Sequence, residues 1–476
     1  MKNLILSAIL SLSFLIVLPF AILAQSKSLE GNWLGTLEFN GIKLRLILKV
    51  SKNADGTFSA KFDSPDQGAN NLPLDSISQQ EKVVRFAGKN YALSYEGTLN
   101  ETGVEIAGTL KQGAAAIPLV LKRTGETVKL SRPQDPQKPY PYDEEEVSYE
   151  NKADNVKIAG TLTLPRGAKT SPAVILITGS GAQDRDETVF GHRPFLVLAD
   201  YLTRRGIAVL RVDDRGIGGT DRGAPTATSE NYAGDVLAGV EYLKTRKEIN
   251  PKQIGLIGHS EGGMIALMVA ARSKDVAFLV LMAGMGQIGE DAIYTQTELL
   301  QKAEGISPEV TKQTNEALKN IFTILKTEKD NKIAEQKIRE ALEKQKSALN
   351  DEQRLQFGGS EANIKAQIPM YLSNWFRYLI AFNPRPMLEK VKVPVLAING
   401  ENDLQVAPKE NLSLIEAGLK MGGNKDVTIV SFPKLNHLFQ TSQKGTLSEY
   451  GKIEETIAPN VLETISNWIL KRASGK

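Results

Sequence analysis

The chain contains no cysteine and only three histidines among its 476 residues. The absence of thiols excludes disulfides, thiolate metal sites, iron–sulfur clusters, a cysteine nucleophile and lipid attachment through cysteine. The scarcity of histidine argues against a His-rich metal site, and we expect neither a metal nor a cofactor. Hydrophobic residues make up 41%, charged residues 24% and aromatic residues 6%, which is ordinary for a globular protein.

Neither sign of charge dominates the sequence. Lys and Arg total 58 and Asp and Glu total 55, so the formal net charge is +3. A nucleic-acid-binding protein of this size usually carries a basic stripe or block, and none is present, so we expect no nucleic-acid partner. At roughly 150 residues per domain, the length allows two or three domains.

One long apolar run stands at the N-terminus. Lys2 precedes the apolar segment Leu4–Leu18, and a small residue, Ala24, ends the region. This order predicts that residues 1–24 are a secretory signal peptide and that the protein is periplasmic or secreted. Ile22 is an imperfect residue three positions before the cleavage point, and an uncleaved anchor is the alternative, because the segment is just long enough to span a bilayer. No later run is long and apolar enough to span.

Residues 25–130 have the pattern of β-strands. Apolar side chains alternate with mostly polar neighbours at Ile42, Leu44, Leu46, Leu48 and Val50. Short strands recur between turns, and Asn-Glu-Thr-Gly joins Leu99 to Val104 as a hairpin. The pattern predicts a small antiparallel barrel or sandwich, in which Trp33 and Tyr95 are core residues rather than ligand contacts.

A proline-rich and acidic segment follows at residues 131–146. It contains Pro133, Pro136, Pro139 and Pro141 and ends with the acidic run Asp143–Glu146. Because proline stiffens a linker and charge keeps it solvated, we expect a domain boundary here, with the acidic run as a solvated spacer.

Residues 147–476 alternate strands with helices. Short runs that are apolar throughout occur at Ala173–Ile177, Ala208–Val212, Ile254–Ile257, Phe278–Met282 and Val393–Ile398. Strands that are apolar on both faces and separated by helices predict a doubly wound, mostly parallel α/β sheet.

The strand pattern is interrupted at about residues 286–388. Glu309–Lys326 and Asn331–Leu349 have helix-period apolar residues in a charged setting, and Tyr371–Phe382 is rich in aromatic residues. An all-helical insertion between two core strands is interpreted as a cap over the active site. The alternative is a structural subdomain unrelated to access.

The most informative motif is Gly258-x-Ser260-x-Gly262. It comes directly after the strand Ile254–Ile257 and directly before the helical run Met264–Ala271. A nucleophile elbow needs this order, because the serine lies in a strained turn where a Cβ on the flanking residues would obstruct the backbone. The five-residue pattern alone is weak, but the strand and the helix on either side make it specific.

A serine needs an adjacent base, and the α/β-hydrolase order is Ser, acid, His. His437 alone lies well downstream of Ser260, in a loop after a strand, so it is the predicted base. His259, beside the nucleophile, is expected to be structural, and His192 is expected near the pocket or in a loop. Asp403 follows a buried strand and a glycine turn, and it is preferred as the acid to its neighbour Glu401 on spacing.

The predicted oxyanion hole consists of two backbone N–H groups. The first belongs to Glu261, the residue after the nucleophile. The second comes from the glycine-rich segment after the first parallel strand, where Ser180 is the choice and Gly181 the runner-up. The pair Gly179-x-Gly181 is also part of a dinucleotide fingerprint, but the third glycine is missing.

From about Val147 onward the chain resembles bacterial α/β-hydrolase esterases of the serine-aminopeptidase (proline iminopeptidase-like) type. The matching segments are Gly179-Ser-Gly-Ala-Gln-Asp-Arg-Asp-Glu187, Asp213-Asp-Arg-Gly-Ile-Gly-Gly-Thr220, Gly258-His-Ser-Glu-Gly-Gly263, Gly400-Glu-Asn-Asp403 and Leu435-Asn-His437. The resemblance implies an α/β-hydrolase fold with a helical cap and a catalytic triad of Ser260, Asp403 and His437. The Gln-Asp-Arg-Asp string is usual in this subgroup, and a structural salt bridge and a substrate contact are both open for it.

These observations lead to three functional hypotheses. The first is an exported serine carboxylesterase that forms an acyl-enzyme on Ser260 and acts on a small acyl ester. The second is an aminopeptidase or other peptidase that uses the same residues on a short peptide. The third is a non-catalytic surface-binding protein. The superfamily includes esterases, lipases, thioesterases and peptidases, so the resemblance does not fix the substrate.

Overall fold

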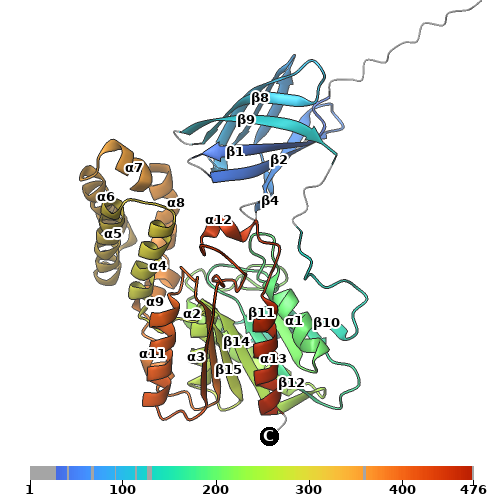
Figure 1. Cartoon of the computed structure of the whole chain (residues 1–476), viewed down its shortest axis with the longest axis vertical. Helices are drawn as coiled ribbons and strands as arrows, with labels where there is room; N and C mark the ends of the chain where they lie inside the picture. Colours follow the sequence, from blue (N-terminus) through green and yellow to red (C-terminus); the bar gives the residue numbers. More distant parts are fainter. Residues whose placement is uncertain are drawn as a thin grey trace, which may run out of the picture. The chain divides into compact units, whose positions relative to one another are not determined.

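The computed structural model describes residues 28–39, 42–65, 69–91, 93–112, 115–125, 131–357 and 361–473. The predicted signal peptide, residues 1–24, lies outside these ranges. The described residues form an N-terminal antiparallel sheet and a C-terminal mixed sheet with helices (Figure 1). Within these ranges, no helix is long and apolar enough to cross a membrane.

The N-terminal sheet is all-β, as the alternating pattern predicts. Its nine strands lie in the order β4-β3-β2-β1-β9-β8-β7-β6-β5. Their bounds are β1 Gly31–Phe39, β2 Ile42–Lys52, β3 Phe58–Ser64, β4 Ala69–Pro73, β5 Ser76–Gln80, β6 Val83–Gly88, β7 Leu93–Leu99, β8 Glu105–Gln112 and β9 Ala115–Thr124, with a short 3₁₀ helix at Lys89–Tyr91. The predicted hairpin after Leu99 is the β7–β8 pair, which is antiparallel. The strands make one continuous sheet rather than the two stacked sheets of a sandwich.

Trp33 and Tyr95 lie in the core of this sheet. Trp33 is fully buried, and its Nε1–H donates to the carbonyl oxygen of Leu29 at 2.8 Å. Tyr95 stacks on Phe86 with 4.7 Å between ring centroids, and its hydroxyl lies 3.1 Å from the carbonyl oxygen of Leu119. Both indole and phenol therefore satisfy their polar atoms on backbone groups, as buried Trp and Tyr usually do.

The C-terminal sheet has eight strands in the order β10-β11-β13-β12-β14-β15-β16-β17. Their bounds are β10 Asp143–Asn151, β11 Val156–Leu164, β12 Ser171–Ile177, β13 Ala208–Val212, β14 Ile249–His259, β15 Phe278–Met282, β16 Val395–Gly400 and β17 Val427–Phe432. The pairs β10–β11 and β11–β13 are antiparallel, and every pair from β13 to β17 is parallel. The predicted mostly parallel sheet is thereby confirmed.

The acidic run at the end of the predicted linker is not a spacer. Asp143–Glu146 forms the first part of the edge strand β10. Its carboxylates are held by cations of the same unit: Glu144 pairs with Lys138, Glu145 with Arg246 and Glu146 with Arg185. The prediction was wrong here because an edge strand tolerates charge along its length, so composition alone cannot separate it from a solvated linker.

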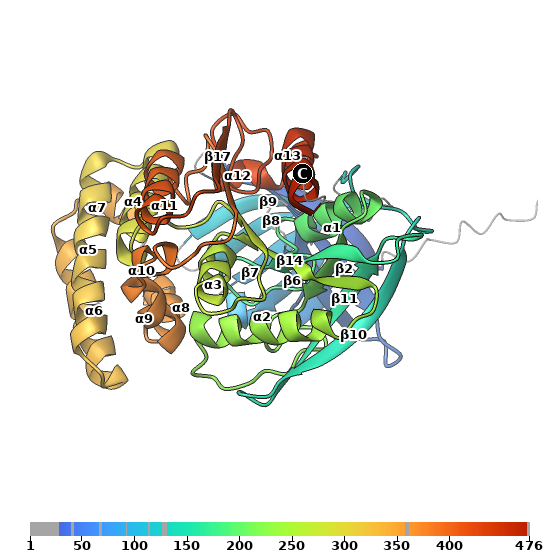
Figure 2. The same ribbon diagram turned by 90° about the horizontal axis from the view of Figure 1, so that it is seen from below.

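Helices cover both faces of the mixed sheet (Figure 2). One apolar core contains side chains of α2 Ser229–Lys244, α3 Glu261–Ala270 and α11 Pro408–Met421. The other contains side chains of α1 Pro194–Arg204 and α13 Pro459–Ala473. Strands β12, β14, β15 and β16 contribute alternate residues to the two cores, which explains why their sequences are apolar throughout.

The insertion between β15 and β16 is all-helical, as predicted. It consists of α4 Gly289–Ala303, α5 Pro308–Thr327, α6 Asn331–Ser347, α7 Asp351–Phe357, α8 Glu361–Tyr371, α9 Asn374–Ala381 and α10 Arg385–Leu388. It has its own small core, in which Phe322 of α5 packs edge-to-face on Phe376 of α9. A short helix, α12 Leu447–Tyr450, follows the last strand.

Candidate active site

Ser260 occupies the turn between a buried strand and a helix. β14 ends at His259 and α3 begins at Glu261, so Ser260 alone forms the corner. Its φ is 53°, in the left-handed region that a non-glycine residue adopts at an energetic cost. A Cβ on Gly258 would collide with the Gly262 carbonyl, and a Cβ on Gly262 would collide with the Ile177 carbonyl. The two glycines are therefore required by close backbone approach.

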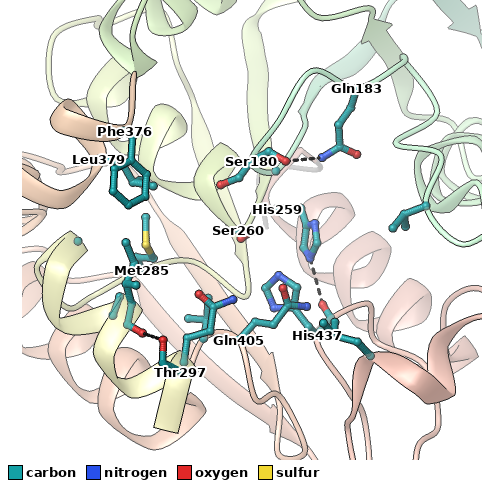
Figure 3. Close-up of a pocket in the computed structure, with 18 of the residues that line it drawn as sticks. Ser180, Gln183, His259, Ser260, Met285, Thr297, Phe376, Leu379, Gln405 and His437 are labelled. Atoms are coloured by element: carbon teal, nitrogen blue, oxygen red, sulfur yellow. Dashed lines mark hydrogen bonds between the residues drawn. The ribbon is translucent and has the colours of Figure 1, made fainter. Parts of the chain in front are cut away.

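A cavity of about 480 Å³ opens over this corner. It is lined by Ser260, Ser180 and His437 from the α/β core and by residues of α4, α8 and α9 from the helical insertion. Figure 3 shows His437 on one side of Ser260 and the apolar side chains of Met285, Phe376 and Leu379 on the other. The insertion thus contributes a wall of the cavity, in agreement with the cap interpretation and against a subdomain unrelated to access.

His437 and Asp403 are in direct contact. The Nδ1 of His437 lies 2.8 Å from Oδ2 of Asp403, and both side chains are buried. The other carboxylate oxygen, Oδ1, accepts the backbone N–H groups of Gln405 at 2.8 Å and Val406 at 2.9 Å. A carboxylate oriented in this way holds the Nδ1–H tautomer of the imidazole and leaves Nε2 free to accept a proton.

The competitor Glu401 points elsewhere. Its carboxylate accepts the hydroxyl of Ser431 at 3.1 Å and is exposed. The preference for Asp403 on spacing therefore agrees with the geometry. Within the described residues, the hydroxyl of Ser260 makes no hydrogen bond, either to His437 or to another group. Such contacts often form only in the substrate complex.

The residues predicted for the oxyanion hole flank the same corner. Ser180 lines the catalytic cavity, whereas the runner-up Gly181 lines a second cavity. Glu261 places its backbone at the first turn of α3, and its side chain is buried. The carboxylate Oε1 of Glu261 accepts the Ser229 hydroxyl at 2.7 Å and the Trp375 indole N–H at 2.8 Å.

The second cavity has a volume of about 420 Å³ and shares Gly179, Met370 and Trp375 with the catalytic one. Asp214 lies in its wall, where it accepts the Thr178 hydroxyl and the Gln183 backbone N–H, each at 2.8 Å. Burial, with added repulsion from nearby carboxylates, raises the pKa of Asp214 to about 7. No motif or spacing in the sequence pointed to this cavity.

The Gln-Asp-Arg-Asp string is mainly structural. Arg185 pairs with Asp213 at 2.7 Å, and Asp186 pairs with the buried Arg211. These contacts decide between the two interpretations of the string in favour of salt bridges. Gln183 differs from the other members, because its side chain lies at the catalytic cavity (Figure 3).

The other two histidines are buried. His192 contacts the Thr456 hydroxyl and the Tyr450 carbonyl at 3.0 Å each, and burial lowers its pKa to about 4. His259 faces the Glu187 carboxylate with Nδ1 and the main chain of His437 with Nε2. Glu187 is a site residue that was not predicted from the sequence, although it is the last residue of the matching segment Gly179–Glu187. Among the described residues, no cluster of three or more His, Asp or Glu side chains is arranged to hold a metal ion.

Comparisons with known proteins identify the family of the chain. Residues 193–442 match the family model described as "Serine aminopeptidase, S33". The match covers more than half of the chain, and the chain belongs to this family. A curated relative, esterase EstD of Thermotoga maritima, is 29% identical over 329 residues, which is 68% of each protein.

Among solved structures, the chain is similar to the Pyrococcus furiosus esterase Pf2001, at 17% identity and a TM-score of 0.41 over 70% of this chain and 93% of that one. It is also similar to Est1E of Butyrivibrio proteoclasticus, at 16% identity and a TM-score of 0.38 over 69% of this chain and 99% of that one. The family match and the esterase relative confirm the prediction of a serine ester hydrolase with the α/β-hydrolase fold.

Proposed function

We propose that the protein is an exported carboxylesterase that forms an acyl-enzyme on Ser260, with His437 as general base and Asp403 as its orienting acid. The observation that carries the proposal is the 2.8 Å contact between Asp403 and His437, whose side chain lines the cavity that contains Ser260. Export rests on the predicted signal peptide at residues 1–24.

In this mechanism Nε2 of His437 takes the Ser260 proton as Oγ attacks the acyl carbonyl carbon. The backbone N–H groups of Glu261 and Ser180 donate to the oxyanion, and loss of one such donor typically costs roughly 100- to 1000-fold in rate. The imidazolium, stabilised by Asp403, then protonates the departing alcohol. His437 next removes a proton from water, which attacks the acyl-enzyme and releases the acid and free Ser260.

The cavity supports a substrate with an apolar acyl group. Met285, Phe376 and Leu379 lie across Ser260 from His437 (Figure 3). An acyl chain directed at these side chains leaves the alcohol near His437, which must protonate it. At about 480 Å³ the cavity is large enough for a small ligand.

An aminopeptidase is the second candidate, because the matched family is described as one. An amide has a poorer leaving group than an ester, but the same serine, base and oxyanion donors would serve it. The difference between the two activities is therefore one of substrate, which the residues of the site leave open.

Hydrolysis of p-nitrophenyl acetate, butyrate and octanoate beside aminoacyl p-nitroanilides tests the proposal, with protein that starts at Gln25. We expect turnover of the esters, loss of turnover in Ser260→Ala, and fluorophosphonate labelling of Ser260 alone. Turnover of the anilides would show that the protein is a peptidase. If neither the esters nor the anilides are hydrolysed and Ser260 is not labelled, the catalytic role of Ser260 is refuted.

A further inference from the structure

A second carboxylate–imidazole pair lies directly behind the predicted triad. The Nδ1 of His259 is 2.9 Å from Oε1 of Glu187, and the Nε2 of His259 is 3.0 Å from the backbone carbonyl oxygen of His437. Glu187 is 2% exposed and His259 is 5% exposed. The same Oε1 of Glu187 also accepts the backbone N–H of Gly179 at 2.8 Å.

The hydrogen-bond partners of His259 determine which of its ring nitrogens are protonated. A carbonyl oxygen can only accept, so Nε2 must carry a hydrogen. An ionised carboxylate can also only accept, so Nδ1 must carry one as well, and the ring is then an imidazolium. Burial acts to lower the pKa of His259, but the charge and hydrogen bond of Glu187 outweigh it, and the pKa is raised. The pair is therefore a buried ion pair whose two charges are both satisfied by hydrogen bonds.

This ion pair joins three segments that meet at Ser260. Gly179 directly precedes Ser180, the predicted oxyanion donor. His259 is the last residue of β14 and directly precedes Ser260. His437 is held through its own main-chain carbonyl. The Glu187 carboxylate and the His259 ring thus hold the backbone of the nucleophile, the base and the oxyanion donor in place.

The ring of His259 also lies beside the ring of the predicted base. The rings of His259 and His437 are 4.7 Å apart between centroids. The charged groups that face His259 from the packed elements are Glu187 and Asp403, with His437 as the titratable neighbour. Both carboxylates favour the charged form of His259.

Resting on the function proposed above, we propose that Glu187 and His259 are a positioning pair, in which a permanently charged His259 holds the Gly179–Ser180 turn and the His437 main chain in place.

The charge state is testable without any substrate, because the chain has only three histidines. We would record ring nitrogen and Cε1–H signals of the full, histidine-labelled protein between pH 5.5 and 9. His259 should show two protonated nitrogens throughout, and His192 should be neutral throughout. A neutral His259 at pH 7.5 overturns the proposal whether or not the protein hydrolyses esters.

The functional consequence is tested with Glu187→Gln, which keeps an acceptor for the Gly179 N–H but removes the counter-ion of His259. A neutral ring can then protonate Nδ1 or Nε2, but not both, so one of its two hydrogen bonds is lost. We expect kcat on p-nitrophenyl butyrate to fall by about 10- to 100-fold, the range that a small misplacement of catalytic groups produces, with KM little changed. In the same variant His259 should show one protonated ring nitrogen instead of two.

Asp186→Asn is the matched control, because Asp186 is on the same segment but pairs with Arg211, away from His259. It should leave kcat and KM on p-nitrophenyl butyrate unchanged. A Glu187→Gln variant with the kcat of the unmodified protein would overturn the proposal. If no ester is hydrolysed at all, the function proposed above fails, and the histidine spectra still decide the charge of His259.

Discussion

The indole of Trp375 donates its Nε1–H to the carboxylate of Glu261 at 2.8 Å. Trp375 belongs to α9 of the helical insertion, and Glu261 is the residue immediately after Ser260. One hydrogen bond therefore ties the cap to the turn whose backbone N–H is the predicted oxyanion donor. Trp375 also lines both cavities.

Trp375→Phe should break this bond and thin the wall between the cavities. A hydrogen bond to a charged group is worth about 1.5–3 kcal/mol, so we expect thermal stability to fall measurably. The two cavities, of about 480 and 420 Å³, should become more nearly continuous, and the octanoate-to-acetate ratio of kcat/KM should rise several-fold. Unfolding scans and the ester chain-length series check both effects. An unchanged ratio would mean that Trp375 does not limit the acyl site.

Asp403→Asn should lower kcat by about 10⁴-fold while the fold stays intact. The N–H groups of Gln405 and Val406 require an oxygen in front of them, so the new amide must turn its NH₂ toward His437. Nδ1 of the imidazole then becomes an acceptor and Nε2 carries the proton, which is the wrong tautomer for a base. Glu401→Gln is the matched control and should retain full activity, because among the described residues the Glu401 carboxylate hydrogen-bonds only to the Ser431 hydroxyl. Equal losses in both variants would contradict the assignment of the acid.

Asp214→Asn should stabilise the protein more at pH 8 than at pH 5. The folded-state pKa of Asp214 is about 7, above its ordinary value of 3.8, so between these values the folded state holds a proton that the unfolded state has lost. The contribution of Asp214 to the free energy of unfolding is therefore present at low pH and falls as the pH rises toward 7.

Asparagine removes this dependence and can still be satisfied, because its oxygen accepts the Gln183 N–H and its NH₂ donates to the Thr178 hydroxyl. Urea unfolding of both proteins at several pH values measures the difference. A difference that does not grow between pH 5 and pH 8 would show that Asp214 is ionised in the folded protein at low pH.

The sequence predicts the local parts of this protein well. The corner at Ser260 is encoded by a strand, two glycines and a helix within a dozen residues, and Asp403 is favoured by its spacing from a buried strand. His437 is found by elimination among three histidines. Each of these inferences depends on neighbours in the chain, and each places the residue in or beside the cavity that the structure shows.

What the sequence could not show are contacts between residues far apart in the chain. Glu187 meets His259 across 72 positions, and Trp375 meets Glu261 across 114. No periodicity or spacing connects such pairs, because they are brought together by the packing of different strands and helices. The edge strand β10 was missed for another reason: its acidic residues are neutralised by cations, among them Arg185 and Arg246, that lie elsewhere in the sequence.

The helical insertion begins after β15 and returns to β16, and these two strands are parallel neighbours in the sheet. The chain therefore leaves and re-enters the core at adjacent points, and the insertion is a replaceable module. Its sequence can be lengthened, shortened or exchanged for that of another protein while the eight strands keep their pairing. Evolution, or an engineer, can thereby change which molecules reach Ser260 without rebuilding the machinery that acts on them.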